Sequence, residues 1–176
     1  MKELLLGCGS RTVKDIYLNG KKDFDNVVRL DINPGHKPDI VHDLTKHPLP
    51  FKDNEFDEIH CYEVLEHLAQ QGDYEFFFRE FSEYWRVLKP DGMFCASVPY
   101  YPSTWSWGDP GHKRVINEGT LVFLDQDEYQ KQIGKTTMSD YRNIYKAHFK
   151  RTFVQVNKTK TSLLFALRAV KNGTSQ

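Results

Sequence analysis

The chain has 176 residues, of which 39% are apolar and 14% aromatic, enough for the hydrophobic core of one domain. Basic and acidic residues number 24 each, so no net charge draws the chain to nucleic acid or to a membrane surface. No apolar run is long enough to cross a bilayer, and residues 1–6 lack the features of a signal peptide. We therefore expect one cytoplasmic domain without a membrane partner.

The charge is unevenly distributed along the chain. Residues 131–176 contain ten basic residues and one acid, Asp140. Such asymmetry can mark an anionic partner, although a solvated surface is the commoner reason. Three cysteines, Cys8, Cys61 and Cys95, form no CxxC pair and are expected to be reduced, buried thiols.

The first half of the chain alternates strand-like and helical patterns. Four strands are expected, over Lys2–Leu6, Val27–Leu30, Asp39–His42 and Phe56–Cys61. A short helix is expected over Thr12–Leu18. Apolar residues at helical spacing predict a second helix over Tyr74–Leu88, which the turn Lys89–Gly92 ends.

The second half begins with a buried type of strand, Met93–Val98. A loop rich in aromatic residues runs to about Lys113, and helical material is expected up to His148. Two further strands, Phe149–Val156 and Ser162–Val170, flank a turn and predict an antiparallel hairpin. The expected fold is α/β: a Rossmann-like three-layer sandwich with a mostly parallel seven-stranded sheet and a final antiparallel hairpin, one domain over 1–176.

Residues suited to binding a nucleoside follow three of these strands. The tight bend Gly7-Cys8-Gly9-Ser10 comes directly after the first strand, where glycine allows the backbone to approach a ligand. Asp31 ends the second strand, where a carboxylate can accept from ribose hydroxyls. Asp43 follows the third strand and could accept from an adenine amino group, with Ile32 and Leu44 packing on the ring. Each signal alone is weak, since a strand-terminal aspartate is more often a turn former.

Taken together, these residues resemble the class I S-adenosylmethionine-dependent methyltransferases. The stretches that carry the resemblance are Leu4–Ser10, Val28–Asp31, Asp43, Leu49–Phe51, Asp53-Asn54, Phe56–Ile59, Glu63–Leu68 and Arg86–Val98. The resemblance covers about the first hundred residues, and it implies S-adenosylmethionine as cofactor. A dinucleotide enzyme is the weaker alternative, because the bend lacks the third glycine that a pyrophosphate requires.

Two positions depart from the family pattern. Leu5 stands where the family usually has an acid two residues before the first glycine, and Arg11 replaces the third glycine. Both positions belong to the region that holds the methionine end of the cofactor, so we expect that end to be held otherwise, through the backbone near Cys61 and Tyr62, or bound more weakly. The first strand begins at residue 2, so acceptor recognition is expected from the Tyr100–Arg114 loop, from the helical insert within 99–148, or from a second subunit.

The residues for methyl transfer are expected after the fourth and fifth strands. Family members that methylate amino groups often carry an Asn/Asp-Pro-Pro-aromatic tetrad where this chain has Cys61–Val64, so a hydroxyl acceptor is favoured. In a helix, Glu63, Glu66 and His67 would share one face, and His112 could join them as a divalent-metal site. The set resembles the metal-dependent O-methyltransferases of ubiquinone biosynthesis and of small-RNA 3′-end methylation. The alternatives are a metal-free general base, His112, or ordinary packing and capping roles.

Other side chains are ambiguous. Four aromatic residues of the loop could line an acceptor pocket or pack the loop on the domain: Tyr100, Tyr101, Trp105 and Trp107. Four histidines without shared spacing are expected at the surface or in turns: His36, His42, His47 and His60.

Three functions remain open. The first is methyl transfer to a hydroxyl of a small molecule or saccharide-like acceptor, with His112 assisting the acceptor. The second is RNA 2′-O-methylation, suggested by the basic last third of the chain. The third is a non-catalytic nucleoside-binding scaffold, suggested by the altered glycine bend; a homo-oligomer is compatible with each.

Overall fold

The computed structural model describes residues 1–18 and 20–171. Its strands form one seven-stranded sheet in the order β3-β2-β1-β4-β5-β7-β6. The strands are β1 Lys2–Leu6, β2 Asn26–Asp31, β3 Ile40–Val41, β4 Phe56–Tyr62, β5 Leu88–Pro99, β6 Phe149–Val156 and β7 Ser162–Ala169. The helices are η1 Pro34–His36, η2 Leu65–His67, α1 Tyr74–Val87, α2 Trp105–Gly108, α3 Glu118–Val122 and α4 Gln126–Gln132.

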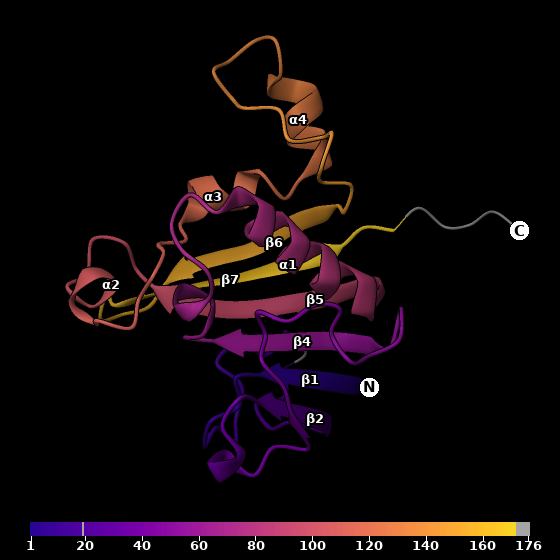
Figure 1. The fold of residues 1–176 in the computed structure, drawn as a ribbon, viewed down its shortest axis with the longest axis vertical. Helices are drawn as coiled ribbons and strands as arrows, with labels where there is room; N and C mark the ends of the chain where they lie inside the picture. Colours follow the sequence, from indigo (N-terminus) through magenta and orange to yellow (C-terminus); the bar gives the residue numbers. More distant parts are fainter. Residues whose placement is uncertain (19, 172–176) are drawn as a thin grey trace, which may run out of the picture.

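The first five strands run parallel, and the last two are antiparallel to their neighbours. Leu6 pairs with Leu30 on one side and Cys61 on the other, which brings the carboxyl ends of β1, β2 and β4 to one edge. The hairpin β6–β7 closes the other side of the sheet against β5. The predicted mostly parallel sheet with a final antiparallel hairpin is therefore confirmed. In Figure 1, α2 lies beyond the arrowheads of β4 and β5, at the edge where a ligand of such a sheet is expected.

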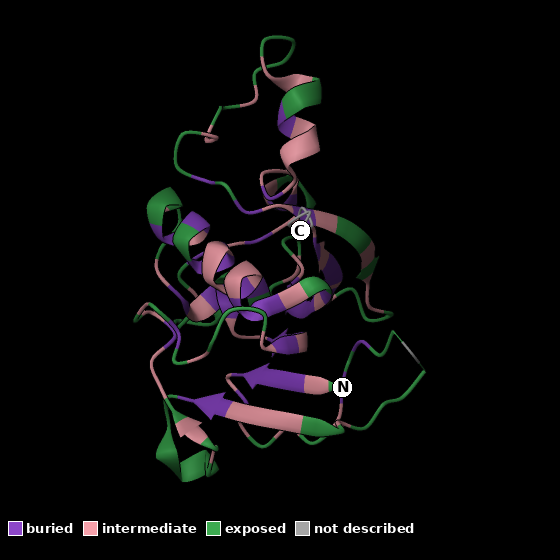
Figure 2. Ribbon diagram, turned by 90° about the vertical axis from the view of Figure 1, so that its right-hand side faces the viewer, coloured by how far each residue is buried: buried purple, intermediate pink, exposed green. Residues whose placement is uncertain are grey.

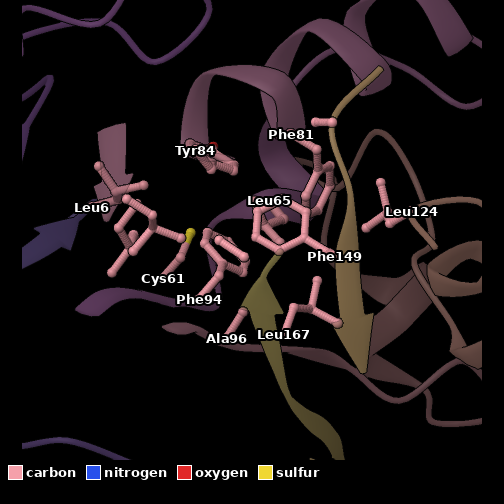
Figure 3. Close-up of a cluster of buried hydrophobic side chains, with 14 of the residues drawn as sticks. Leu6, Cys61, Leu65, Phe81, Tyr84, Phe94, Ala96, Leu124, Phe149 and Leu167 are labelled. Carbon is pink, nitrogen blue, oxygen red and sulfur yellow. The ribbon is translucent and has the colours of Figure 1, made fainter. Parts of the chain in front are cut away.

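Helix α1 covers one face of the sheet. Its N-cap Asp73 accepts from the Phe76 N–H at 3.0 Å, and it ends at Val87, just before the predicted turn. Aromatic side chains fill the space beneath it: Phe81 and Tyr84 of α1 contact Phe94 of β5, at ring-centroid distances of 5.6 and 4.9 Å. Figure 3 shows this core, and Figure 2 shows the buried residues gathered along the sheet and the inner side of α1.

The opposite face of β1, β4 and β5 is covered by residues 11–18 and 20–25, which we call the cover segment. The helix expected over Thr12–Leu18 is wrong: this stretch is irregular, with one antiparallel bridge between Val13 and Asp23. Ile16 packs with Leu5 and Tyr62, while Lys14 lies completely buried under the segment. Because Lys14 is buried, the buried side of this stretch does not have the apolar spacing of an amphipathic helix, which explains why the predicted helix is absent.

The insert after β5 is less helical than expected. Only α2, α3 and α4 interrupt it, and no helix is found over residues 133–148, all of which belong to the described part of the chain. Figure 2 shows mostly exposed residues along the loop that projects beyond α4. Among the described residues, none of the helices has the length and apolar character needed to cross a bilayer.

Candidate functional site

The glycine bend and Asp31 form one hydrogen-bonded unit. The Asp31 carboxylate accepts from the Gly9 N–H and from the Asn33 N–H, both at 2.8 Å. The Cys8 N–H donates to the Leu30 carbonyl at 3.0 Å, which continues the β1–β2 pairing into the bend. Asp31 is buried, so these two donors fix its orientation. A carboxylate has about four lone-pair sites, so Asp31 can accept further donors from a ligand.

The two glycines of the bend serve different purposes. Both have positive φ, 57° at Gly7 and 47° at Gly9, a region that glycine adopts without strain. A Cβ at Gly7 would lie 2.5 Å from Val64 Cγ2, so Gly7 is required by packing. A Cβ at Gly9 would meet nothing within 4 Å. Gly9 therefore borders open space beside the Asp31 carboxylate.

The residues after β2 and β3 differ in what they offer. Ile32 is 64% exposed, whereas Leu44 packs in the main core beneath the surface. Asp43 accepts from the Thr45 N–H at 2.9 Å and the Thr45 hydroxyl at 2.8 Å, and these hydrogen bonds lower the pKa of its carboxyl. Both contacts use the same oxygen, Oδ1.

Two other predicted site residues have side chains turned toward the cover segment. Cys8 is buried in the small apolar cluster with Leu5, as expected for a free thiol, and Ser10 lies exposed beside it in the bend. The Tyr62 hydroxyl lies 2.8 Å from His60 Nδ1 and accepts from the Ile16 N–H at 3.2 Å. Only the backbone groups of Cys8 and Tyr62 are therefore available to a ligand bound at the carboxyl ends of the strands.

Glu66, His67 and His112 come together at the end of β4. One ligand atom from each lies within 4.8 Å of the others, and the two imidazole rings meet edge-on at 4.7 Å. Glu66 is 2% exposed, and both carboxylate oxygens lack a hydrogen-bond partner among the described residues. Burial raises the pKa of this carboxyl to about 8. His112 Nε2 lies 3.9 Å from Glu66 Oε1, which is too long for a hydrogen bond.

Glu63 does not join this group, which corrects the predicted four-residue set. The segment that follows β4 is not α-helical: Glu63 has a φ of 54°, and only Leu65–His67 form a 3₁₀ turn. The Glu63 carboxylate instead accepts from the Ser97 hydroxyl at 2.7 Å. The i, i+3, i+4 spacing was therefore the wrong geometry for this segment.

The loop with His112 is held by contacts that the sequence did not reveal. Arg114 donates to the Leu65 carbonyl at 2.7 Å and to Glu80 Oε2 of α1 at 2.6 Å, in a buried ion pair. The Lys113 N–H donates to the Glu66 carbonyl at 2.8 Å. Arg114 and Glu80 lie 34 residues apart, and no spacing pattern links such a pair.

A second buried polar network was also missed, under the cover segment. Lys14 Nζ donates to Glu3 at 2.6 Å and lies 3.4 Å from Glu58, which in turn contacts His60 Nε2 at 3.0 Å. His60 is fully buried, so its expected surface position is wrong. Burial alone would lower the pKa of Lys14, but hydrogen bonding and charge from Glu3 and Glu58 outweigh it and raise that pKa. The alternation of Glu58, His60 and Tyr62 along β4 was the available signal.

Comparison with known proteins identifies the family to which the chain belongs. A family model described as a methyltransferase domain matches residues 4–96, more than half of the chain. The chain belongs to this methyltransferase family. It is a class I S-adenosylmethionine-dependent methyltransferase, as the sequence resemblance implied. Family membership favours the enzymatic hypotheses over the non-catalytic scaffold, the third alternative. No protein of curated function matches the sequence.

Solved methyltransferases share the fold at low sequence identity. A S-adenosylmethionine-dependent methyltransferase of Archaeoglobus fulgidus has a TM-score of 0.57 at 15% identity, over 95% of this chain and 85% of its own. A chain of the complex between the Haloferax volcanii Trm112 activator and a methyltransferase has a TM-score of 0.57 at 16% identity, over 97% and 83%. The N-methyltransferase NodS of Bradyrhizobium japonicum has a TM-score of 0.55 at 12% identity, over 97% and 86%. At these identities the likeness concerns the fold alone.

Proposed function

We propose that this methyltransferase transfers the methyl group to a hydroxyl of a small or saccharide-like acceptor, with His112 as the proton acceptor. The observation that carries the proposal is the buried Glu66 carboxylate beside the half-buried His112 at the carboxyl end of β4. Bound S-adenosylmethionine supplies a methyl group on a sulfonium, a good leaving group. The protein must then position the acceptor and remove its proton.

The cofactor side rests on the glycine bend. The open space at Gly9 beside the Asp31 carboxylate is a cradle that fits an adenosine, with Asp31 accepting from the ribose hydroxyls. The second Asp43 oxygen, Oδ2, would accept from the adenine amino group, and the exposed Ile32 side chain would lie against the ring. The backbone of Gly7–Ser10 would line the remaining contact.

The acceptor side rests on Glu66 and His112. With a carboxyl pKa of about 8, Glu66 is mostly uncharged at neutral pH. His112 Nε2 lies 3.9 Å from Glu66 Oε1 and makes no hydrogen bond to it, so this nitrogen is available to the acceptor hydroxyl. The exposed Tyr101, Trp105 and Trp107 of the loop at 99–148 would contact an acceptor ring or saccharide face.

A divalent ion is the alternative role for the same residues. Glu66, His67 and His112 supply one carboxylate and two imidazoles, a set that suits a transition-metal ion and could lower the pKa of an acceptor hydroxyl. Because Glu66 must ionise to bind a cation, Mn²⁺ affinity should rise as the pH approaches 8. Methyl transfer that is lost in chelator and restored by Mn²⁺ would assign this role; transfer unaffected by chelator would exclude it.

The RNA alternative has less support. Four of the ten basic residues in the last third form ion pairs within the chain: Lys131, Arg142, Lys150 and Arg168. Paired cations release fewer counterions on binding a phosphate backbone. A partner protein is compatible with the fold, since a chain of similar fold was solved with the Trm112 activator.

The test compares variants that retain the fold. His112→Gln should reduce methyl transfer to a panel of alcohols and saccharides by about 100-fold or more, while binding of S-adenosylhomocysteine is unchanged. The matched control is His36→Gln, an exposed histidine of η1, which should leave transfer unchanged. Full transfer by the His112 variant would contradict its role, and transfer to amines alone would contradict the hydroxyl acceptor.

A further inference from the structure

An open cleft lies on the side of the cover segment, and its lining begins at Arg11, the residue that follows the glycine bend. It has a volume of about 550 Å³. The cover segment, the residue after β4, the end of β5 and the β6–β7 hairpin all contribute to its lining. The lining includes Arg11, Tyr17, Glu63, Ser97, Asn157 and Ser162. The charged residues of the lining are the cations Arg11, Lys14 and Lys22 and the acids Asp15 and Glu63. Lys14 is paired with Glu3, and Arg11 is paired with Asp15.

Glu63 is held in an unusual conformation at this cleft. Its φ of 54° is strained for a residue with a side chain, and such strain is concentrated at functional sites. The Glu63 N–H donates to the Ser97 carbonyl at 2.9 Å, and its Oε1 accepts from the Ser97 hydroxyl at 2.7 Å. These contacts aim the carboxylate while its second oxygen, Oε2, can accept another donor.

The register of the sheet places Glu63 close to the glycine bend. Leu6 pairs with Cys61, so Gly7 and Tyr62 follow side by side at the ends of β1 and β4. Val64 touches the position that a Gly7 Cβ would occupy. Glu63 therefore lies in the sequence between Tyr62 and Val64, the two residues that neighbour Gly7 at the start of the bend.

Arg11 is the cation of the cleft that directly follows the glycine bend in the sequence. Its guanidinium lies over the Tyr62 ring, 4.7 Å from the centroid, and donates to Asp15 at 2.6 Å. Tyr62 is itself held by His60 and Ile16, so the ring is a fixed platform. A guanidinium has five N–H donors, of which the contact with Asp15 uses one. Arg11 can therefore keep its position and still donate to a carboxylate.

We infer that Glu63 and Arg11 hold the amino-acid tail of S-adenosylmethionine, Glu63 accepting from its ammonium group and Arg11 pairing with its carboxylate. This inference depends on the proposed cofactor site. It accounts for Leu5, which leaves the end of β1 without an acid, and for Arg11 in place of a glycine. A zwitterionic tail carries the two charges that the cleft complements, and each contact would be a charge-assisted hydrogen bond.

The test compares two ligands that differ only in the tail. S-adenosylhomocysteine carries the amino-acid group, and 5′-methylthioadenosine lacks it; both are titrated calorimetrically into the wild-type chain and its variants. Glu63→Gln should weaken S-adenosylhomocysteine binding by about 10- to 100-fold and leave 5′-methylthioadenosine binding unchanged. Arg11→Gln should show the same selectivity, and it provides the test if the Glu63 variant does not fold.

The control is Glu75→Gln, an exposed acid in the first turn of α1, which should change neither affinity. Equal losses for both ligands, or no loss for either, would overturn the inference while the proposed cofactor site stands. A wild-type chain that binds 5′-methylthioadenosine and S-adenosylhomocysteine equally well would also overturn it. A wild-type chain that binds neither ligand would refute the proposed site, and the inference with it.

Discussion

Replacing Lys14 by methionine is expected to lower the free energy of unfolding by about 3–5 kcal/mol, the usual cost of removing one partner of a buried ion pair. The Lys14 side chain is 0% exposed, and its ammonium lies 2.6 Å from Glu3 and 3.4 Å from Glu58. Methionine preserves much of the volume but leaves two buried carboxylates without their cation. Domain stabilities are about 5–15 kcal/mol, so roughly a fifth or more would be lost.

Urea denaturation measures this loss. With an m-value of about 2 kcal/mol/M, the midpoint should fall by roughly 1.5–2.5 M. In Lys14→Met the pKa of Glu58 should rise, because burial raises it and the lowering charge of Lys14 is gone. The deficit should therefore be larger at pH 8 than at pH 5, where the Glu58 carboxyl begins to protonate.

Two further variants make this prediction specific. Lys22→Met changes an exposed lysine of the same cover segment and should alter stability by less than about 0.5 kcal/mol. Adding Glu3→Gln to Lys14→Met should restore part of the loss, since it removes one uncompensated charge. A Lys14→Met chain within about 1 kcal/mol of wild type at pH 8 would refute the assigned role of the network.

Three other outcomes follow from the structure. Glu66→Gln should become more stabilising as the pH rises from about 5 to 8. The Glu66 pKa is about 8 in the folded chain against 4.5 in the unfolded chain, so ionisation favours unfolding by up to about 1.4 kcal/mol per pH unit in this range. Urea midpoints at pH 5.5 and 8.5 check this, and a constant difference between variant and wild type would contradict it. Gly9→Ala should lower the free energy of unfolding by only about 1–2 kcal/mol yet abolish S-adenosylhomocysteine binding. Gly7→Ala, whose Cβ would lie 2.5 Å from Val64, should lower the melting temperature more than Gly9→Ala does. A larger loss of stability in Gly9→Ala than in Gly7→Ala would be inconsistent with the cradle. Phe81→Ala should lose about 3–5 kcal/mol in thermal unfolding, because the ring is fully buried against Phe94 and Tyr84, and a loss below 1 kcal/mol would not fit that packing.

The sequence predicted the elements whose pattern is local. Strand Lys2–Leu6 and the helix from Tyr74 were predicted because their apolar residues recur at strand and helix spacing. The cover segment was not, because Lys14 is buried by partners from two distant strands, and an ion pair leaves no periodic signal.

In the candidate site, too, some residues could be predicted from the sequence and others could not. The bend at Gly7–Ser10 and Asp31 could be predicted together because the ends of neighbouring parallel strands meet at one edge. The position of Glu63 could not, since its positive φ overrides the helical spacing from Glu63 to His67. The proximity of His112 to Glu66 was predicted from their residue types. The Arg114–Glu80 ion pair that holds the His112 loop was not predicted, because it is a long-range contact.

The most direct test of the account is calorimetric titration of S-adenosylhomocysteine into the wild-type chain and the Asp31→Ala variant. Saturable binding at one site per wild-type chain is expected, and about 100-fold weaker binding once the carboxylate beside Gly9 is removed. Absence of binding to the wild-type chain, or equal affinity in the variant, would contradict the assignment of this bend as the cofactor site.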